Sequence, residues 1–299
     1  MRNSFAQTVI SQCNQDDSIF LTGDLGFMAL EEVKSTFGAR FVNAGVAEQN
    51  MIGVAAGLAR GGFKVFTYSI APFCYARPFE QIRNDICFGN LPVCLVGNGG
   101  GYAYGHMGPT HHALEDCAAM NALGVRVLVP AFDEDISAML SQLSSPTYLR
   151  LGYDVRPKNT SVPEYSSWRQ VLSGEQGAIA ALGPLAGVAW QALQNVPADK
   201  RPSVWAVTEF NADGIPEEFW QQVSGSPLYV TEEHVSAGGL GMFISLAMVR
   251  RGIQVSNFVH RYALGYPTNR FGSQDFHRAQ CGLDVDGVLT MIDGHEHES

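Results

Sequence analysis

The chain has 299 residues, of which 46% are hydrophobic and 16% charged, a composition typical of a globular protein large enough for two domains. Its formal net charge of −10, without any run of lysine or arginine, argues against a nucleic-acid-binding protein. No apolar stretch is long enough to cross a membrane and the opening residues do not resemble a secretion signal, so we expect a cytoplasmic protein without membrane contact.

The first half of the chain alternates segments that predict strands with segments that predict helices. Residues 17–24 form an apolar run ending in Thr-Gly-Asp, which predicts a buried parallel strand followed by a functional loop. Residues 47–62 predict a helix, because small side chains permit close packing and two glycines end it. The alternation continues with predicted strands over 40–46, 64–70, 91–101 and 125–131, and predicted helices over 79–88 and 113–123. A doubly wound parallel α/β sheet is therefore predicted for residues 1–155.

The second half predicts a smaller α/β domain. Residues 156–172 are polar, contain proline and have weak periodicity, so they are interpreted as a linker. Apolar runs at 177–184, 203–210 and 227–234 predict strands, each followed by helix-like or glycine-rich sequence. The second domain is predicted to cover residues 173–292, and the polar tail 293–299 is expected to be disordered.

Two neighbouring stretches of the first half carry polar groups at predicted strand ends. Glu48 lies where a strand passes into a helix, although an acid in the first turn of a helix is also stabilised there for purely structural reasons. Residues 68–85 are rich in aromatic side chains and arginine, and two prolines interrupt any regular helix. Aromatic clusters are usually part of a core, but loops at the ends of parallel strands are where ligands bind.

A glycine-rich loop over residues 97–112 carries His106, His111 and His112. Their spacing matches no standard zinc motif, so no metal site is predicted, and the loop is not a P-loop. A flexible loop that presents imidazoles suits proton transfer or oxyanion binding. A second glycine cluster at Gly238, Gly239 and Gly241 precedes a predicted helix, where it could cradle a phosphate or simply permit close packing.

Taken together, these stretches resemble the C-terminal half of the transketolase family. The resemblance rests on colinear motifs, which are VAEQNMIGVAAGLA (46–59), RPFEQIRND (77–85), GPTH (108–111), VTEEHVSAGGLG (230–241) and CGLDVDGVL (281–289). It implies a thiamine-diphosphate pyrimidine-binding domain followed by a transketolase C-terminal domain. The implied reaction moves a two-carbon ketol unit from a ketose to an aldehyde in carbohydrate metabolism.

The resemblance also implies roles for individual residues near the cofactor. Glu48 would activate thiamine diphosphate through its pyrimidine ring, and Phe73, or less favourably Tyr75, would stack on that ring. Asp24 would lie near the cofactor. His111 would handle a hydroxyl or carbonyl group of the substrate.

Further residues are implied to contact the substrate. His106 would act beside His111. Three arginines fall where family members hold sugar phosphate or stabilise neighbouring loops, namely Arg2, Arg77 and Arg150.

The sequence departs from the family pattern in two ways. It lacks the Gly-Asp-Gly motif with a downstream Asn that binds the diphosphate and Mg²⁺ (or Ca²⁺), so an N-terminal partner subunit is expected to supply that half, in an α2β2 heterotetramer. Gly99-Gly100 and Met107 replace polar residues of many transketolases, which suggests an atypical sugar.

Two other functions stay open at this point. One is decarboxylation of a 2-oxo acid with carboligation or acyl transfer, as in 1-deoxyxylulose-5-phosphate synthase or the β subunits of 2-oxo acid dehydrogenases. The other is a non-catalytic subunit that stabilises a partner. The GPTH motif favours ketol transfer, and the presence of Glu48, Phe73 and His111 together argues against a non-catalytic subunit.

Overall fold

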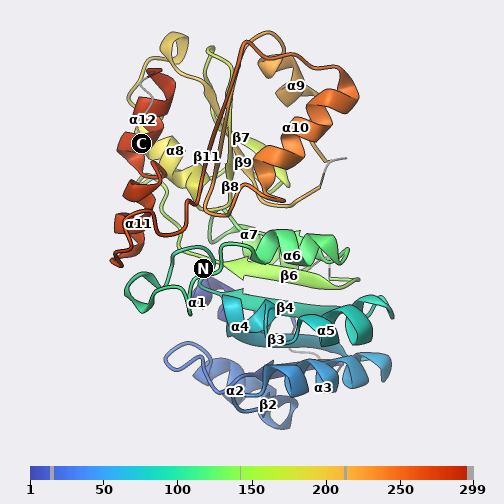
Figure 1. Ribbon diagram of the computed structural model, residues 1–299. Helices are drawn as coiled ribbons and strands as arrows, with labels where there is room; N and C mark the ends of the chain where they lie inside the picture. Colours follow the sequence, from blue (N-terminus) through green and yellow to red (C-terminus); the bar gives the residue numbers. More distant parts are fainter. Residues whose placement is uncertain (14–16, 142, 212–213, 295–299) are drawn as a thin grey trace.

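In the computed structural model, described for residues 1–13, 17–141, 143–211 and 214–294, two α/β domains lie one against the other (Figure 1). The first domain contains a sheet with the strand order β2-β1-β3-β4-β6-β5, in which every pairing is parallel. Its strands are β1 (Ser18–Thr22), β2 (Phe41–Asn43), β3 (Lys64–Ile70), β4 (Val93–Asn98), β5 (Arg126–Leu128) and β6 (Thr147–Leu151). Strands β1 and β6 are buried along their whole length, as expected for a parallel sheet covered on both faces.

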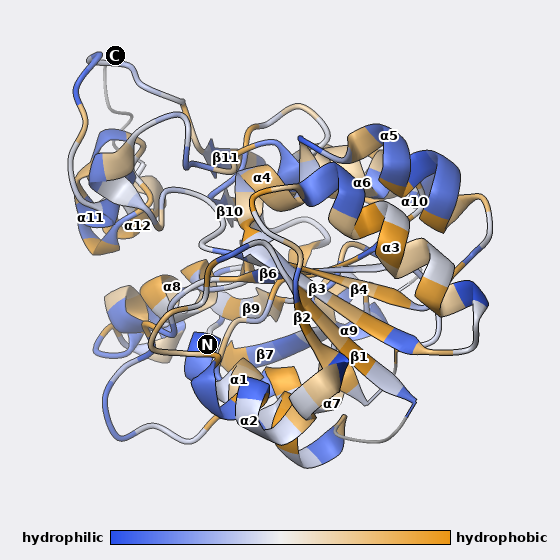
Figure 2. Cartoon of the chain, turned by 90° about the horizontal axis from the view of Figure 1, so that it is seen from below, coloured by the Kyte–Doolittle hydropathy of each residue, from blue (hydrophilic) through white to orange (hydrophobic). Residues whose placement is uncertain are grey.

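Helices cover both faces of this sheet, which confirms the predicted doubly wound α/β fold (Figure 2). One face packs against α1 (Arg2–Gln12), α2 (Glu31–Phe37) and α7 (Asp135–Leu140). The other face packs against α3 (Glu48–Arg60), α4 (Ala71–Tyr75) and α6 (Asp116–Ala122). The predicted helix over 79–88 is instead a short α5 (Phe79–Gln81) followed by a π-helical turn at Ile82–Cys87.

The second domain contains a five-stranded sheet with the order β11-β10-β8-β9-β7. Its strands are β7 (Trp168–Leu172), β8 (Ala178–Leu182), β9 (Ser203–Val207), β10 (Pro227–Glu232) and β11 (Asn257–Tyr262). Its helices are α8 (Leu185–Leu193), α9 (Glu217–Val223), α10 (Leu240–Arg251), α11 (Gln274–Gln280) and α12 (Val285–Ile292).

The start of the second domain and one of its strands differ from the sequence prediction. The last part of the expected linker forms β7, which pairs antiparallel with β9, so the sheet begins inside residues 156–172. Strand β11 was not predicted, because its side chains are partly or largely exposed and give no apolar run. Residues 295–299 of the expected tail lie outside the described residues. Within the described part, no helix has the length and apolar character needed to span a bilayer.

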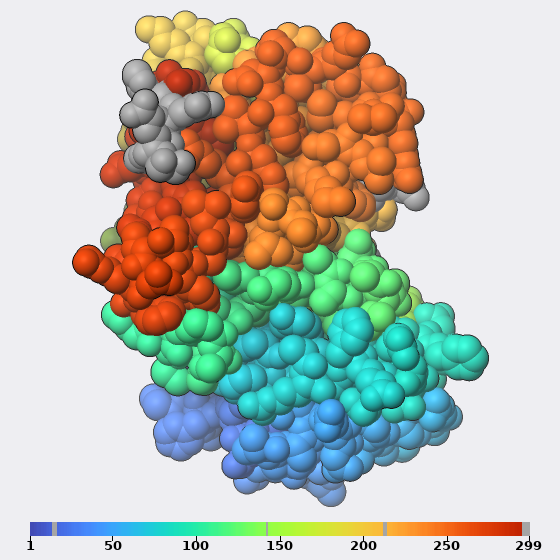
Figure 3. All heavy atoms as spheres, in the orientation of Figure 1, coloured from blue at the N-terminus to red at the C-terminus, as the bar shows by residue number. Residues whose placement is uncertain are grey.

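The buried guanidinium of Arg150, on β6, joins the two domains. It donates to Asp116 Oδ2 at 2.8 Å, to the carbonyl of Ala113 at 2.7 Å and, across the domain junction, to the carbonyl of Glu233 at 2.9 Å. The backbone N–H of Ala118 in α6 donates to Nε2 of His234 at 3.2 Å, which adds a second polar contact across the junction. In space-filling view the orange-red part of the second domain rests directly on the green loop segment of the first (Figure 3).

Arg150→Met is expected to lower the free energy of unfolding by about 3–5 kcal/mol, because it leaves the buried carboxylate of Asp116 without its cation. Urea denaturation followed by tryptophan fluorescence measures this change. Arg251→Met is the matched control, since the Arg251–Glu217 pair is exposed and its loss is expected to cost under about 1 kcal/mol. Equal midpoints for the two variants would contradict the assigned role of Arg150.

Candidate active site

Glu48 is a buried acid at the carboxyl end of the first sheet. It opens α3 directly after the loop that follows β2, and its side chain is only 2% exposed. Oε1 accepts a hydrogen bond from the hydroxyl of Ser69 at 3.0 Å, and Oε2 accepts one from Nη1 of Arg77 at 2.7 Å. Ser69 was not predicted from the sequence, although a serine in the otherwise apolar end of β3 was a possible signal. The carboxylate is therefore held in one orientation by a residue of β3 and by a residue of the turn between α4 and α5.

Phe73 and the carboxylate of Glu48 both contact the side chain of Arg77. The guanidinium carbon of Arg77 is 3.7 Å from the centroid of the Phe73 ring, so the planar cation covers one face of that ring. Tyr75 has a different environment, because its hydroxyl donates to Oε2 of Glu115 at 3.3 Å and burial raises its pKa. Of the two aromatic candidates, the structure brings Phe73 next to the groups that contact Glu48.

The glycine-rich loop places His111 next to Phe73. The two ring centroids are 5.2 Å apart, and the ring of Tyr104 is 5.9 Å from that of His111. Nδ1 of His111 shares a hydrogen bond with the hydroxyl of Thr110 at 2.9 Å. His106 is exposed on the short 3-10 turn Gly105–Met107, so it lies on the same loop without a described contact to Phe73.

The second domain holds this loop in place. Burial lowers the pKa of His112, which is consistent with a neutral ring that donates from Nε2 to the carbonyl of Gly105 and accepts at Nδ1 from the hydroxyl of Tyr266. The backbone N–H of Tyr102 donates to Oε1 of Glu233 at 2.6 Å. His112 is thus part of the support of the loop, whereas His111 faces the site.

The glycines of this loop also have a packing reason. A Cβ added to Gly100 would lie 2.4 Å from Nε of Arg150, and one added to Gly101 would lie 2.5 Å from Oε1 of Glu233. Gly101 additionally has φ = +63°, a conformation that side-chain-bearing residues rarely adopt. These positions are glycine because the loop must approach the domain junction closely.

Arg2 and Asp24 lie at the same edge of the sheet. Arg2 is exposed at the start of α1 and lines a cavity of about 350 Å³ together with Asn98, Tyr104 and Tyr153. Tyr104 therefore connects this cavity to the ring of His111. Asp24 is exposed directly after β1 and accepts a hydrogen bond from the amide of Asn43 at 2.7 Å, so it joins the ends of β1 and β2.

The surroundings of Arg150 and of the glycines before α10 decide between the roles that the sequence left open. Arg150 was expected to hold substrate phosphate or to stabilise loops, and its burial against three protein acceptors leaves loop stabilisation as its role. Of the two roles left open for the glycines at the start of α10, the structure supports close packing, because the buried carboxylate of Glu232 already accepts from the N–H groups of Leu240 and Gly241 at 2.7 and 3.0 Å.

The domain belongs to the class of open α/β sheets, and its candidate site lies at the carboxyl ends of the parallel strands, where such sheets bind ligands. The buried acid, the aromatic ring face and the loop histidine all converge there, from α3, α4 and the loop after β4.

Comparison with known proteins names the family within that class. Residues 1–152 match the family described as "Transketolase, pyrimidine binding domain". The chain is 28% identical to one of the subunits of the apulose-4-phosphate transketolase of Phocaeicola vulgatus, over 96% of this chain and 94% of the relative. It is also 28% identical to a protein of Methanocaldococcus jannaschii described as a putative transketolase C-terminal section, over 98% and 95% of the two chains.

A solved structure supports the same conclusion. The chain superposes on "Split gene transketolase, inactive beta4 tetramer" with a TM-score of 0.81 and 25% identity, covering 98% of this chain and 97% of the other. The chain belongs to the transketolase family. It corresponds to the C-terminal subunit of a split transketolase.

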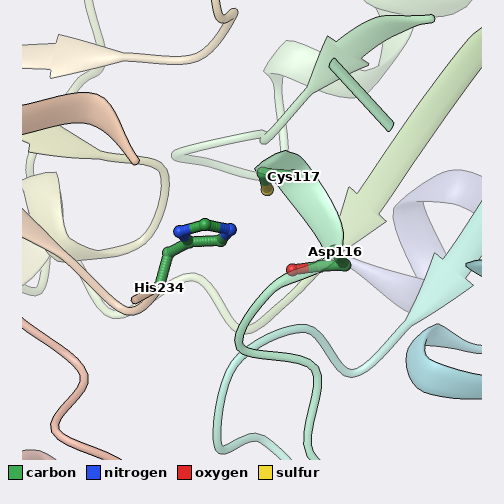
Figure 4. A group of neighbouring side chains, drawn as sticks. All are labelled: Asp116, Cys117 and His234. Atoms are coloured by element: carbon green, nitrogen blue, oxygen red, sulfur yellow. The ribbon is translucent and has the colours of Figure 1, made fainter. Parts of the chain in front are cut away.

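A separate cluster at the domain junction has the composition of a metal site. Asp116, Cys117 and His234 direct their donor atoms to within 4.8 Å of one another (Figure 4). Oδ2 of Asp116 already accepts from Tyr148 and Arg150, and the two ring nitrogens of His234 contact the Ala118 N–H and the Val235 carbonyl. Burial raises the pKa of Cys117 well above its usual value, whereas a metal ligand must be a thiolate. Because their donor atoms already have protein partners, we interpret these three side chains as part of the domain junction and not as a metal site.

Equimolar Zn²⁺ is therefore expected to leave the melting temperature of the protein unchanged, because binding would require these buried contacts to break. Differential scanning fluorimetry with and without a chelator measures the effect. A zinc-dependent rise that His234→Gln removes would contradict this assignment.

Proposed function

We propose that this chain is the pyrimidine-binding and C-terminal-domain subunit of a thiamine-diphosphate-dependent transketolase, which moves a two-carbon ketol unit from a ketose to an aldehyde. In this proposal residues 1–155 form the pyrimidine-binding domain and residues 168–292 the C-terminal domain. The relative named for apulose 4-phosphate supports a sugar phosphate outside the usual substrates as donor.

The observation that carries the proposal is the pair of contacts made by the guanidinium of Arg77. This planar N–H donor touches the buried carboxylate of Glu48 at 2.7 Å and covers the ring of Phe73 at 3.7 Å. A planar nitrogen heterocycle that binds a carboxylate through a ring nitrogen needs the same two partners, a carboxylate and an aromatic face. The aminopyrimidine of thiamine diphosphate is such a ring, so the residues present fit the cofactor, and the guanidinium stands in for it here.

Each residue of the site then has a defined task. When bound, thiamine diphosphate would supply the nucleophilic carbon for addition to the ketose carbonyl, which permits cleavage of the neighbouring carbon–carbon bond. Glu48 holds a proton at the ring nitrogen, while the hydroxyl of Ser69 keeps its carboxylate in one orientation. Phe73 orients the ring by stacking, and His111 exchanges a proton with a substrate hydroxyl or carbonyl.

The outer parts of the site are assigned to substrate and cofactor contacts. Arg2 lies on the cavity that Tyr104 shares with His111, which supports a role in binding a substrate anion. Asp24 is assigned to cofactor contacts and His106 to substrate contacts, because both residues lie at this same edge of the sheet.

A partner subunit is part of the proposal. The chain lacks the motif that binds the diphosphate and Mg²⁺ (or Ca²⁺), so an N-terminal subunit would hold both in an α2β2 assembly. Relatives named as one subunit of a transketolase or as a split-gene product support this division. Large apolar side chains also lie exposed between Asp24 and Glu48 in the sequence, where a partner could cover them, namely Phe27 (83% exposed), Met28 (75%) and Val46 (72%).

Glu48→Gln is expected to lower activity by about 10³-fold or more, because the amide cannot supply the proton at the ring nitrogen. The measurement uses the chain co-purified with its diphosphate-binding partner, thiamine diphosphate, Mg²⁺ and a panel of ketose phosphates and 2-oxo acids as donors. The melting temperature of the variant checks its folding. An active Glu48→Gln enzyme would refute the mechanism, and turnover with 2-oxo acids alone would favour the synthase-like alternative.

Phe73→Ala is expected to weaken thiamine diphosphate binding about three- to tenfold in the same complex, the value of one aromatic stacking contact. Tyr75→Phe serves as its partner variant and is expected to bind the cofactor normally, since its hydroxyl contacts Glu115. Isothermal titration calorimetry measures both affinities. The reverse ranking would reassign the stacking role to Tyr75.

A further inference from the structure

Arg77 occupies both of the contacts that the proposed cofactor ring requires. Its Nη1 is 2.7 Å from Oε2 of Glu48, and its guanidinium carbon is 3.7 Å from the centroid of Phe73. The other carboxylate oxygen of Glu48 accepts from Ser69, so Oε2 is the oxygen that a ring nitrogen would use. The guanidinium therefore lies at the place assigned to the pyrimidine.

Guanidinium and aminopyrimidine are close chemical analogues. Both are planar, both stack on an aromatic face, and both present an N–H group to the carboxylate once the pyrimidine ring nitrogen carries the proton held by Glu48. A stacked ring face cannot hold two planar groups at the same contact distance. The side chain of Arg77 and the pyrimidine ring thus exclude each other from this position.

The surroundings of Arg77 allow it to leave. Its side chain is 42% exposed, whereas that of Glu48 is 2% exposed, so the arginine lies at the open side of the contact. The residue lies between α4 and α5, and its backbone carbonyl accepts a hydrogen bond from the amide of Gln49 at 3.2 Å, which fixes the backbone while the long side chain can rotate. Solvent can hydrate the released guanidinium, so displacement has a modest cost.

We propose that Arg77 is an internal competitor for the pyrimidine site, which the cofactor must displace from Glu48 and Phe73 in order to bind. This inference rests on the proposed function, because it takes that site to be the one for thiamine diphosphate. Once displaced, the guanidinium stays within reach of the site that Phe73 and His111 line, where it can hold a substrate anion. Arg77 would then couple cofactor binding to the formation of the substrate site.

The competition has a predictable size. The exposed ion pair with Glu48 and the cation–π contact with Phe73 keep Arg77 in this position for part of the time. The apparent affinity for the pyrimidine ring falls in proportion to the fraction of time that the position is free. Removing the competitor is expected to tighten binding by about tenfold, equivalent to about 1.4 kcal/mol. If Arg77 instead remained in place and helped to bind the ring, its removal would weaken binding.

The test uses the full chain and the pyrimidine fragment 4-amino-5-hydroxymethyl-2-methylpyrimidine, so that the diphosphate-binding partner is not needed. Ligand-observed NMR titrations give its dissociation constant for the wild type and for four variants. Arg77→Met keeps an unbranched apolar stem without the charge, and Arg77→Lys keeps the charge without the planar group. Glu48→Gln removes the acceptor of the ring nitrogen.

Arg251→Met is the matched control variant. Arg251 forms an ion pair with Glu217 at 3.0 Å, is 44% exposed and lies over the ring of Trp220 at 5.5 Å, so it reproduces the chemistry of Arg77 in the other domain. Melting temperatures of all variants check their folding.

We expect the fragment to bind Arg77→Met about tenfold more tightly than the wild type, Arg77→Lys at an intermediate level, Arg251→Met like the wild type, and Glu48→Gln far more weakly. Equal or weaker binding to Arg77→Met and Arg77→Lys, with the loss in Glu48→Gln retained, overturns the competition and leaves the proposed function intact. Binding that is the same in Glu48→Gln as in the wild type, or absent from every variant, overturns the pyrimidine site itself and the inference with it.

Discussion

The buried guanidinium of Arg150 links the two domains at the loop that follows β4. It neutralises Asp116 at the start of α6 and binds the carbonyls of Ala113 and Glu233, so β6, the segment 113–116 and the second domain meet at one cation. An unpaired charge at this depth would cost several kcal/mol, which means that these segments must all be in place together. Gly100 permits the approach, since any larger residue would collide with the guanidinium.

The position of the loop histidine follows from this junction. The loop after β4 is held at Tyr102 by Glu233 and at His112 by Tyr266, both residues of the second domain. His111 lies between these two anchored residues in the sequence and is thereby directed at Phe73. The second domain therefore positions the loop at the candidate site, although none of its described residues has a hydrogen bond to Glu48.

The site itself depends on a carboxylate kept in a dry position with defined partners. Parallel strands bring their carboxyl ends to one edge, so Glu48 after β2 and Ser69 at the end of β3 meet although they are distant in sequence. The remaining oxygen faces the open side, where Arg77 and Phe73 lie. The carboxylate is fixed by Ser69 through one oxygen, and its other oxygen lies beside an aromatic face. This combination selects for planar N–H donors, which is the chemical basis of the proposed pyrimidine site.

The sequence by itself determined the fold class, because buried parallel strands leave continuous apolar runs and their helices leave a regular alternation. It also determined the family, through short motifs around Glu48, Phe73 and His111 whose order along the chain is specific. It failed where the signal is weak: β11 is too exposed to give an apolar run, and β7 lies in a stretch with the polarity of a linker.

Only the tertiary structure decided what the individual charged side chains do. Arg2, Arg77 and Arg150 are equivalent as sequence letters, yet one lines an open cavity, one covers Phe73 and one is buried at the domain junction. Ser69, Glu232 and Glu233 acquire their roles in the same way, through partners far along the chain. The physical reason is that the role of a charge is set by its burial and its nearest partners, which folding brings together from distant segments and which no local pattern encodes.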